Sequence, residues 1–145
     1  IAYVFPTMQN VNRALLEGLT LAGGTEIAGT RIEASLDWQN AEDRATGNAL
    51  TYRARRYGSL DIARDFGALE LGASLVASGP RFVDAANTRT LAGYARLDLR
   101  ASYAIRPEWR VLARVNNALD ADYSLVENYN TPGIEGFLGI EYRPR

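Results

Sequence analysis

The chain has 145 residues, which by length corresponds to a single domain. It contains no cysteine and no histidine, so disulfides, thiol nucleophiles, serine–histidine–aspartate triads and cysteine or histidine metal sites are excluded. Its 16 basic residues, all arginine, nearly balance 17 acidic residues, whereas a nucleic-acid-binding domain would need a basic surplus. We therefore expect no thiolate or imidazole metal site and no nucleic-acid partner; no other metal and no cofactor is expected either.

No apolar run approaches the roughly 18–20 residues of a membrane-spanning helix, and the longest covers residues 1–5. The first residue is Ile1, not methionine, so we expect further sequence upstream. A mean hydropathy on the polar side does not exclude a membrane β-barrel, because barrel strands alternate apolar and polar residues.

The dominant pattern along the chain is alternation of apolar and polar residues with a period of two. Residues 13–22 are open to two interpretations, an amphipathic helix or a strand, and Gly18 in their middle favours the strand. In residues 31–39 every even position from Ile32 to Trp38 is apolar and every odd position is polar, which predicts a strand with one apolar face. Similar patterns predict eight strands in all, the others lying around 1–5, 59–62, 69–78, 95–105, 109–116 and 134–142.

The breaks between these segments are of two kinds. Short breaks lie at residues 28–30, 66–68 and 106–108, and longer polar breaks lie at 6–12, 43–49, 79–93 and 128–133. Since short and long breaks alternate, the strands are expected to form antiparallel hairpins in an up-and-down meander. Tight turns at one end and long loops at the other are typical of outer-membrane barrels.

The aromatic residues fall into two predicted belts. Phe66, Tyr103 and Trp109 lie on or beside short turns and Tyr142 lies near the end of the chain, whereas the other belt lies towards the long loops and comprises Trp38, Phe82, Tyr94 and Tyr123. Two belts with aliphatic residues between them match the aromatic girdles at the two membrane interfaces of a barrel. The alternation itself suits a soluble β-sandwich equally well, and the belts favour the membrane barrel.

Residues 116–123, with the sequence NNALDADY, resemble the N-L-F-D-x-D-Y segment near the C-terminus of TonB-dependent outer-membrane receptors. The matching residues are Asn117, Leu119, Asp120, Asp122 and Tyr123. Upstream, the strand-opening pattern N-V-x-x-A-x-x-x-G of the same family resembles Asn10, Val11, Ala14 and Gly18. The order and spacing of these segments hold over nearly the whole chain and look most like the cobalamin receptor branch.

This resemblance implies a fold and a function. Receptors of this family have a barrel of about 22 strands with a plugged lumen, and residues 1–145 would be the last eight or so strands without the plug. The fold class expected is therefore all-β, an antiparallel meander from the C-terminal part of a transmembrane barrel. The implied function is uptake of a bulky, scarce ligand across the bacterial outer membrane, energised by TonB. The ligand would be cobalamin or, as a second candidate, an iron–siderophore complex.

The resemblance also implies several partners, and two other interpretations of the chain stay open. The partners would be outer-membrane lipid, the receptor's own plug and remaining barrel strands, TonB and the small-molecule ligand; no enzymatic activity is expected. One alternative is a self-contained eight-stranded outer-membrane barrel with a structural or adhesive role, because eight strands are enough to close a barrel. The other is a soluble β-sandwich module.

Each candidate site residue can be interpreted as having either a structural or a functional role. Arg53 matches an arginine in a segment where the cobalamin receptor touches its substrate, and Tyr52 stands where the neighbouring residue is basic; the alternative for Arg53 is an ion pair inside the barrel. Asp120 and Asp122 would share one face of a strand, and we expect a polar cluster there rather than acid–base chemistry or a metal site. The residues expected at the membrane interfaces are Trp38, Phe66, Tyr103, Trp109 and Tyr142.

Overall fold

The protein was analysed as a computed structural model, which describes residues 2–4, 7–9 and 13–144. Within these residues the secondary structure consists of β-strands, turns and irregular segments. No helix in the described part of the chain is long and apolar enough to cross a membrane. In chain order the strands are β1 (Ala2–Val4), β2 (Thr7–Gln9), β3 (Ala14–Ile27), β4 (Thr30–Asp43), β5 (Arg56–Phe66), β6 (Leu69–Ser78), β7 (Arg81–Phe82), β8 (Thr90–Leu91), β9 (Tyr94–Arg106), β10 (Trp109–Asn116) and β11 (Glu135–Tyr142).

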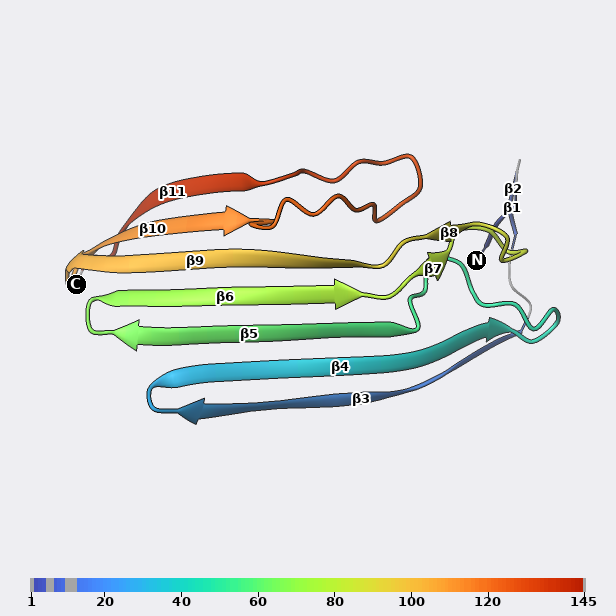
Figure 1. The fold of residues 1–145 in the computed structure, drawn as a ribbon, viewed down its shortest axis with the longest axis horizontal. Coiled ribbons are helices and arrows are strands. Elements are labelled where there is room, and N and C mark those ends of the chain that lie inside the picture. Colours follow the sequence, from blue (N-terminus) through green and yellow to red (C-terminus); the bar gives the residue numbers. More distant parts are fainter. Residues whose placement is uncertain (1, 5–6, 10–12, 145) are drawn as a thin grey trace.

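Seven of these strands form one antiparallel sheet in the order β11-β10-β9-β6-β5-β4-β3. Each strand of the sheet pairs with the next strand of the sheet along the chain, so the topology is an up-and-down meander (Figure 1). The predicted all-β antiparallel meander is therefore confirmed. The sheet is open: β3 and β11 are its two edges and do not pair with each other in the described residues, as a closed eight-stranded barrel would require.

Tight turns lie at one end of the sheet and longer loops at the other (Figure 1). Ala28 and Gly29 connect β3 to β4 and both have positive φ, 50° and 74°, as a two-residue turn with the twist of a hairpin requires. The connections from β5 to β6 and from β9 to β10 are equally short. Residues 44–55, 79–93 and 117–134 make the long connections, at the end of the sheet where the sequence predicted long breaks, and the first and last are longer than the predicted breaks 43–49 and 128–133.

Three details differ from the sequence prediction. The first predicted strand does not join the sheet: Ala2–Val4 pairs with Thr7–Gln9 in a separate two-stranded sheet, and the large sheet has seven strands instead of eight. The segment 6–12, predicted as a loop, contains β2, and the loop 79–93 contains β7 and β8. Tyr52 and Arg53 lie before β5, which begins at Arg56. The motif residues Asn10 and Val11 lie outside the described residues.

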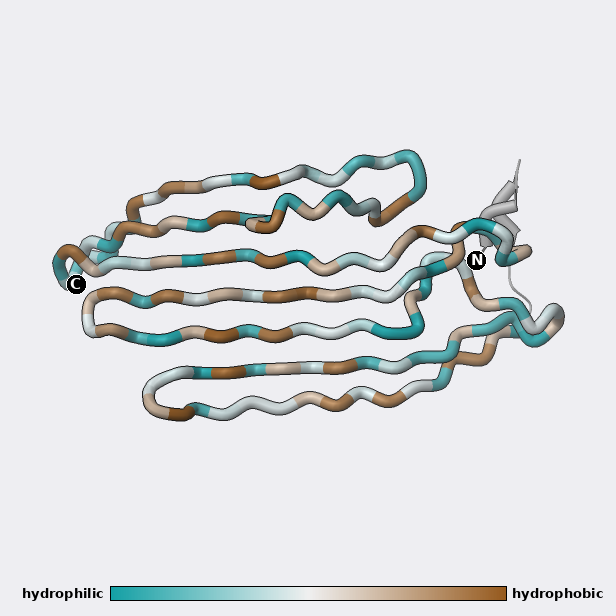
Figure 2. The backbone as a smooth tube through the Cα atoms, viewed as in Figure 1, coloured by the Kyte–Doolittle hydropathy of each residue, from teal (hydrophilic) through white to brown (hydrophobic). Residues whose placement is uncertain are grey.

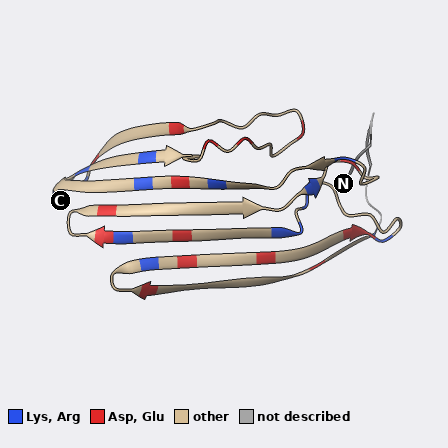
Figure 3. Cartoon of the chain, viewed as in Figure 1, with Lys and Arg blue, Asp and Glu red and all other residues tan. Residues whose placement is uncertain are grey.

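The two faces of the sheet have opposite chemistry. Residues paired across an antiparallel sheet share a face, and one row runs Ile32, Ile62, Ala73, Leu99 and Val115 from β4 to β10. We call this side the apolar face. The next row, on the other side, runs Glu33, Asp61, Ser74 and Asp98, and we call that side the polar face. The alternation is visible along the strands in Figure 2, and the charged positions in Figure 3.

The apolar face has no second layer over it. In the described part of the chain only Ala41, Ala54, Ala63 and Val83 are buried hydrophobic residues, whereas Leu19, Leu36, Leu138 and Ile140 are about half or more exposed. A soluble sandwich would bury such a face against another sheet. The described structure therefore contradicts the sandwich alternative and fits a wall with lipid on one side.

Candidate functional site

The centre of the polar face holds an ion pair that spans three strands. Arg100 on β9 donates two hydrogen bonds to Asp61 on β5, with Nη1–Oδ2 and Nη2–Oδ1 distances of 2.7 and 2.6 Å. The hydroxyl of Ser74, on the strand between them, donates to Asp61 and accepts from Arg100 at 2.8 Å. The Arg100 side chain crosses β6 at Gly72, where a Cβ would lie 2.5 Å from its Nε atom.

Neighbouring charges on the polar face are also matched. Arg31 lies 3.9 Å from Asp65 and 3.7 Å from Glu70, and the Arg96 guanidinium donates to Asp98 at 2.9 Å. Such partly exposed pairs each contribute little to stability. Each of these carboxylates lies close to an arginine, so opposite charges are paired in this part of the face. The arrangement suits a polar wall.

Hydrogen bonds made by the family-motif segment 116–123 connect the last long loop to the sheet. Asn117 is 2% exposed and has a φ of 50°, and its backbone N–H donates to the Asp98 carboxylate at 2.9 Å. Its side-chain amide accepts from the N–H of Ala121 and donates to the carbonyls of Ala121 and Pro132 at 2.9, 3.0 and 3.4 Å. A buried asparagine with its hydrogen-bonding groups satisfied fixes the geometry of the chain around it.

The other motif residues have separate roles in this loop. Asp120, also with positive φ, accepts a hydrogen bond from the Ile134 N–H at 3.0 Å and so positions the start of β11. Asp122 is exposed, and Leu119 is 63% exposed. The segment follows β10 as a turn and loop rather than a strand, so Asp120 and Asp122 do not form the shared-face pair that the sequence suggested.

Tyr123 belongs to a second cluster, which joins the loops 79–93 and 117–134. Its ring stacks on Tyr94 with centroids 4.4 Å apart. Arg81 is 7% exposed, lies 5.8 Å from the Tyr94 ring centroid, and donates to the carbonyls of Ser124 and Leu125 at 2.6 and 3.1 Å. Arg81 was not predicted from the sequence, since nothing local distinguishes it from the other arginines.

Arg53 lies in a basic hollow at the loop end of the sheet. The hollow has a volume of about 490 Å³, and Arg55, Arg56 and Arg81 line it together with Arg53. Among the described residues, the ion pairs do not include Arg53, Arg55 or Arg56. Tyr52, with a φ of 58°, is 39% exposed and its N–H donates to the carbonyl of Phe82 at 2.8 Å. The hollow is thus suited to a ligand with negatively charged groups.

Five aromatic residues of the predicted belts lie at the ends of the sheet. Tyr94, which was predicted for the belt towards the loops, instead pairs with Ser78 on the polar face, and its ring stacks on Tyr123. Trp109 and Tyr142 pair across β10 and β11 next to the last tight turn, with ring centroids 4.7 Å apart. Phe66 ends β5 at its tight turn, and Tyr103 pairs with Leu69 at the same end. Trp38 pairs with Arg56 near the loops. All five are between 42 and 55% exposed, and their contact with a membrane interface stays a prediction.

The fold and these features agree with one family of proteins. A family model described as "TonB dependent receptor-like, beta-barrel" matches residues 2–118. The chain belongs to this family. Its barrels are bacterial outer-membrane proteins, so the sheet described here is part of an outer-membrane barrel wall.

Individual relatives show how much of a receptor this chain represents. The vitamin B12 transporter BtuB of Photobacterium profundum is 29% identical over 121 residues, which are 83% of this chain and 20% of that protein. The siderophore receptor PiuA from Acinetobacter baumannii superposes with a TM-score of 0.79 at 21% identity, over 89% of this chain and 22% of that one. A mutant ferric enterobactin receptor PfeA from Pseudomonas aeruginosa gives a TM-score of 0.77 at 19% identity, over 92% and 23%. The chain therefore spans about a fifth of the length of these relatives.

Proposed function

We propose that the chain forms the C-terminal part of the barrel in a TonB-dependent receptor that takes up cobalamin across the outer membrane. The proposal that the ligand is cobalamin rests on the similarity to a vitamin B12 transporter over 83% of the chain. The placement within the receptor rests on the motif around Asn117, which resembles a segment near the C-terminus of such receptors. The intact mass of the gene product in outer-membrane preparations tests the placement: we expect several times the mass of this chain.

In this proposal the chain contributes part of the barrel wall and part of the ligand entrance, and it performs no catalytic step. The polar face lines the inside of the barrel against the plug, and the apolar face meets lipid. The loops 44–55, 79–93 and 117–134 face the outside and form part of the ligand entrance. Ligand would bind to these loops and to the plug, and TonB would act on the plug to open a path.

Arg53 is the residue of this chain proposed to touch the ligand. It lines the basic hollow with Arg55 and Arg56, and a guanidinium donates strong hydrogen bonds to anionic oxygens such as those of a phosphate. Because losing such a bond typically costs about 1.5–3 kcal/mol, Arg53→Ala should weaken ligand binding roughly tenfold to a hundredfold. Arg44→Ala is the matched control, since Arg44 is an exposed arginine of the same loop outside the lining of the hollow.

The binding test uses the purified full-length receptor and cyanocobalamin in calorimetric titration. Saturable binding that Arg53→Ala weakens and Arg44→Ala leaves unchanged supports the proposal. Binding unchanged in Arg53→Ala would assign Arg53 a structural role. If cobalamin does not bind and a ferric siderophore does, the second candidate function is correct; the basic hollow favours it because guanidinium groups suit anionic iron complexes.

A further inference from the structure

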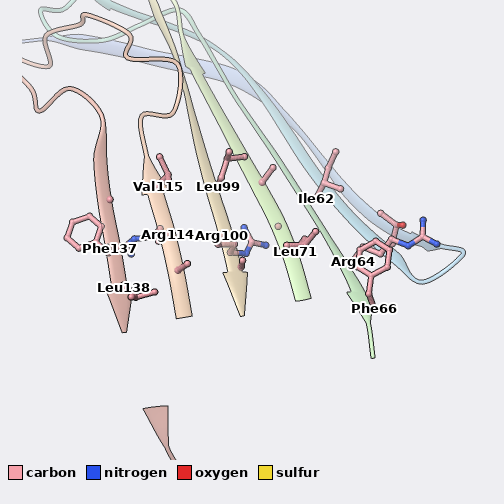
Figure 4. Close-up of a pocket in the computed structure, with 16 residues that line it drawn as sticks. Ile62, Arg64, Phe66, Leu71, Leu99, Arg100, Arg114, Val115, Phe137 and Leu138 are labelled. Carbon is pink, nitrogen blue, oxygen red and sulfur yellow. The ribbon is translucent and has the colours of Figure 1, made fainter. Parts of the chain in front are cut away.

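The apolar face has a hollow where small residues replace large ones. One row across the sheet runs Arg64, Leu71, Ala101, Ala113 and Leu138, so that two alanines lie side by side at its centre. The next row towards the loops contributes Ala73 and Gly136. Larger side chains surround these positions, and together they line an open hollow of about 930 Å³ (Figure 4).

The walls of this hollow are apolar. Ile62, Leu99 and Val115 border it towards the loops, and Leu71 and Leu138 border it along the central row. Small residues at a membrane-facing surface let another chain approach closely and gain many dispersion contacts. A flexible hydrocarbon chain can follow such an irregular surface.

Among the described residues that line the hollow, Arg64 is the one basic residue whose side chain lies on the apolar face. Arg64 pairs with Thr30 and Leu71, which places it on the apolar face, and its guanidinium carbon lies 5.1 Å from the Phe66 ring centroid. Figure 4 shows Arg64 and Phe66 next to each other at one side of the hollow. Arg100 and Arg114 also border the hollow, but their pairing with Gly72 and Phe137 places their side chains on the polar face.

Arg64 has no carboxylate partner in the described part of the chain, because none of the ion pairs there includes it. None of the lining residues is acidic. The lining residues of a second copy of this chain, seated face to face on the hollow, would bring no carboxylate to Arg64. A charged group left unpaired in an apolar contact is costly, so the occupant should carry a negative charge itself.

The position of Arg64 near one end of the membrane-spanning strand indicates that the occupant of the hollow is a lipid. It lies two positions before Phe66, which ends β5 at a tight turn. In the proposed orientation the tight turns face the periplasm. Arginine side chains near the ends of membrane segments extend their guanidinium groups to the headgroup level while their aliphatic part stays in the hydrocarbon.

We propose that this hollow is a binding site for an anionic phospholipid of the inner leaflet. One acyl chain lies over Ala101 and Ala113, and the headgroup phosphate accepts hydrogen bonds from Arg64. This site is on the opposite side of the sheet from the proposed ligand pathway and does not depend on which ligand the receptor transports.

The charge of the site is tested with the full-length receptor reconstituted into nanodiscs containing equal amounts of phosphatidylglycerol and phosphatidylcholine. After re-extraction in mild detergent, mass spectrometry measures the retained lipids. We expect enrichment of phosphatidylglycerol that falls about fivefold in Arg64→Gln, since one arginine near an anionic headgroup contributes about 1 kcal/mol. Arg106→Gln, at the end of β9 beside a tight turn and outside the lining, should keep the enrichment. No enrichment in the unaltered receptor, or equal losses in both variants, would overturn the proposal.

The shape of the site is tested by filling it. Ala113→Phe should reduce retention of both lipids several-fold, and Ala101→Leu should do the same to a smaller extent. Ala34→Phe is the control, because Ala34 lies on the apolar face outside the hollow. Heat-modifiable gel migration shows that each variant is folded, and Ala101→Leu replaces Ala113→Phe if the latter fails. If the filled variants retain as much lipid as Ala34→Phe, the hollow is not the binding site.

Discussion

The Arg100 guanidinium reaches Asp61 across the intervening strand β6 at Gly72. The two strands that carry the pair are not neighbours in the sheet, and the N–O distances of 2.6 and 2.7 Å show contact at both oxygens. A Cβ on Gly72 would lie 2.5–2.9 Å from Arg100 atoms, so the missing side chain leaves the space for this crossing. A glycine inside a strand here marks a close approach.

Gly72→Ala should displace Arg100 and weaken this ion pair. We expect Gly72→Ala to be less stable than Gly139→Ala by about 1–2 kcal/mol, given the value of charged hydrogen bonds and the partial exposure of the pair. Gly139 is the control because a Cβ there meets nothing within 4 Å. Denaturant unfolding of the full receptor in lipid measures the difference.

A double-mutant cycle identifies the cause of the stability lost in Gly72→Ala. In an Arg100→Met background the Gly72→Ala substitution should lose most of its effect, because the charged contact is already gone. An equal cost in both backgrounds would show that the alanine disturbs the strand itself.

Asn117 should be the most sensitive motif residue. Asn117→Ala removes its side-chain hydrogen bonds and leaves an alanine at a φ of 50°, so we expect a loss of about 2–4 kcal/mol. Asn117→Gly should cost less, because glycine adopts positive φ freely. Denaturant unfolding measures both variants, with Asn130→Ala in the exposed part of the loop as the control. Similar values for the glycine and alanine variants would contradict the conformational part of this account.

Arg81 should control the order of the loop 117–134. Arg81→Met removes the donors to the carbonyls of Ser124 and Leu125, and proteolytic cleavage within that loop should accelerate about tenfold to a hundredfold. Arg89→Ala removes an ion pair with Glu127 whose arginine side chain is 59% exposed, and should change cleavage by less than about fivefold. Equal cleavage rates in the two variants would show that burial of Arg81 is not what orders the loop.

The loop 79–93 should lose order in acid. The Thr88 hydroxyl, followed by the N–H groups of Arg89 and Thr88, donates hydrogen bonds to Asp84 and lowers the pKa of its carboxyl group. Because the pKa is lowered on folding, this stabilisation is fully present above the usual aspartate pKa and is lost as the pH falls through the lowered pKa. The protection of the Thr88 and Arg89 amides from hydrogen exchange, relative to the intrinsic exchange rate at each pH, should fall over that acidic range. Asp84→Asn should remove the pH dependence, and its persistence would assign the effect to another group.

The strand pattern was readable from the sequence wherever one face of a strand is apolar. Residues 109–116 were predicted as a strand with the bounds that β10 has, and residues 13–22 proved to be strand rather than helix. Alternation with a period of two gives this information because the pleat places successive side chains on opposite faces. The tight turns were equally clear, since Ala28–Gly29 and Gly67 interrupt the pattern.

The candidate site was only partly predictable. The motif resemblance located Asn117, but not its burial or its hydrogen bonds to Ala121 and Pro132. Arg53 was found by resemblance, whereas its neighbours in the hollow, Arg56 and Arg81, were not anticipated. The Arg81 contacts join residues 43 and 44 positions apart along the chain, and local patterns do not encode such distances.

The sequence by itself determined that this protein is a meander of two-faced strands with tight turns at one end and long loops at the other. Only the tertiary structure decided which small residues gather beside Arg64, which glycine lets Arg100 cross a strand, and which loops Arg81 joins. The reason is physical: alternation and turn chemistry are local properties, set by a few consecutive residues. Rows, hollows and ion pairs depend on the register between strands, which many residues set together.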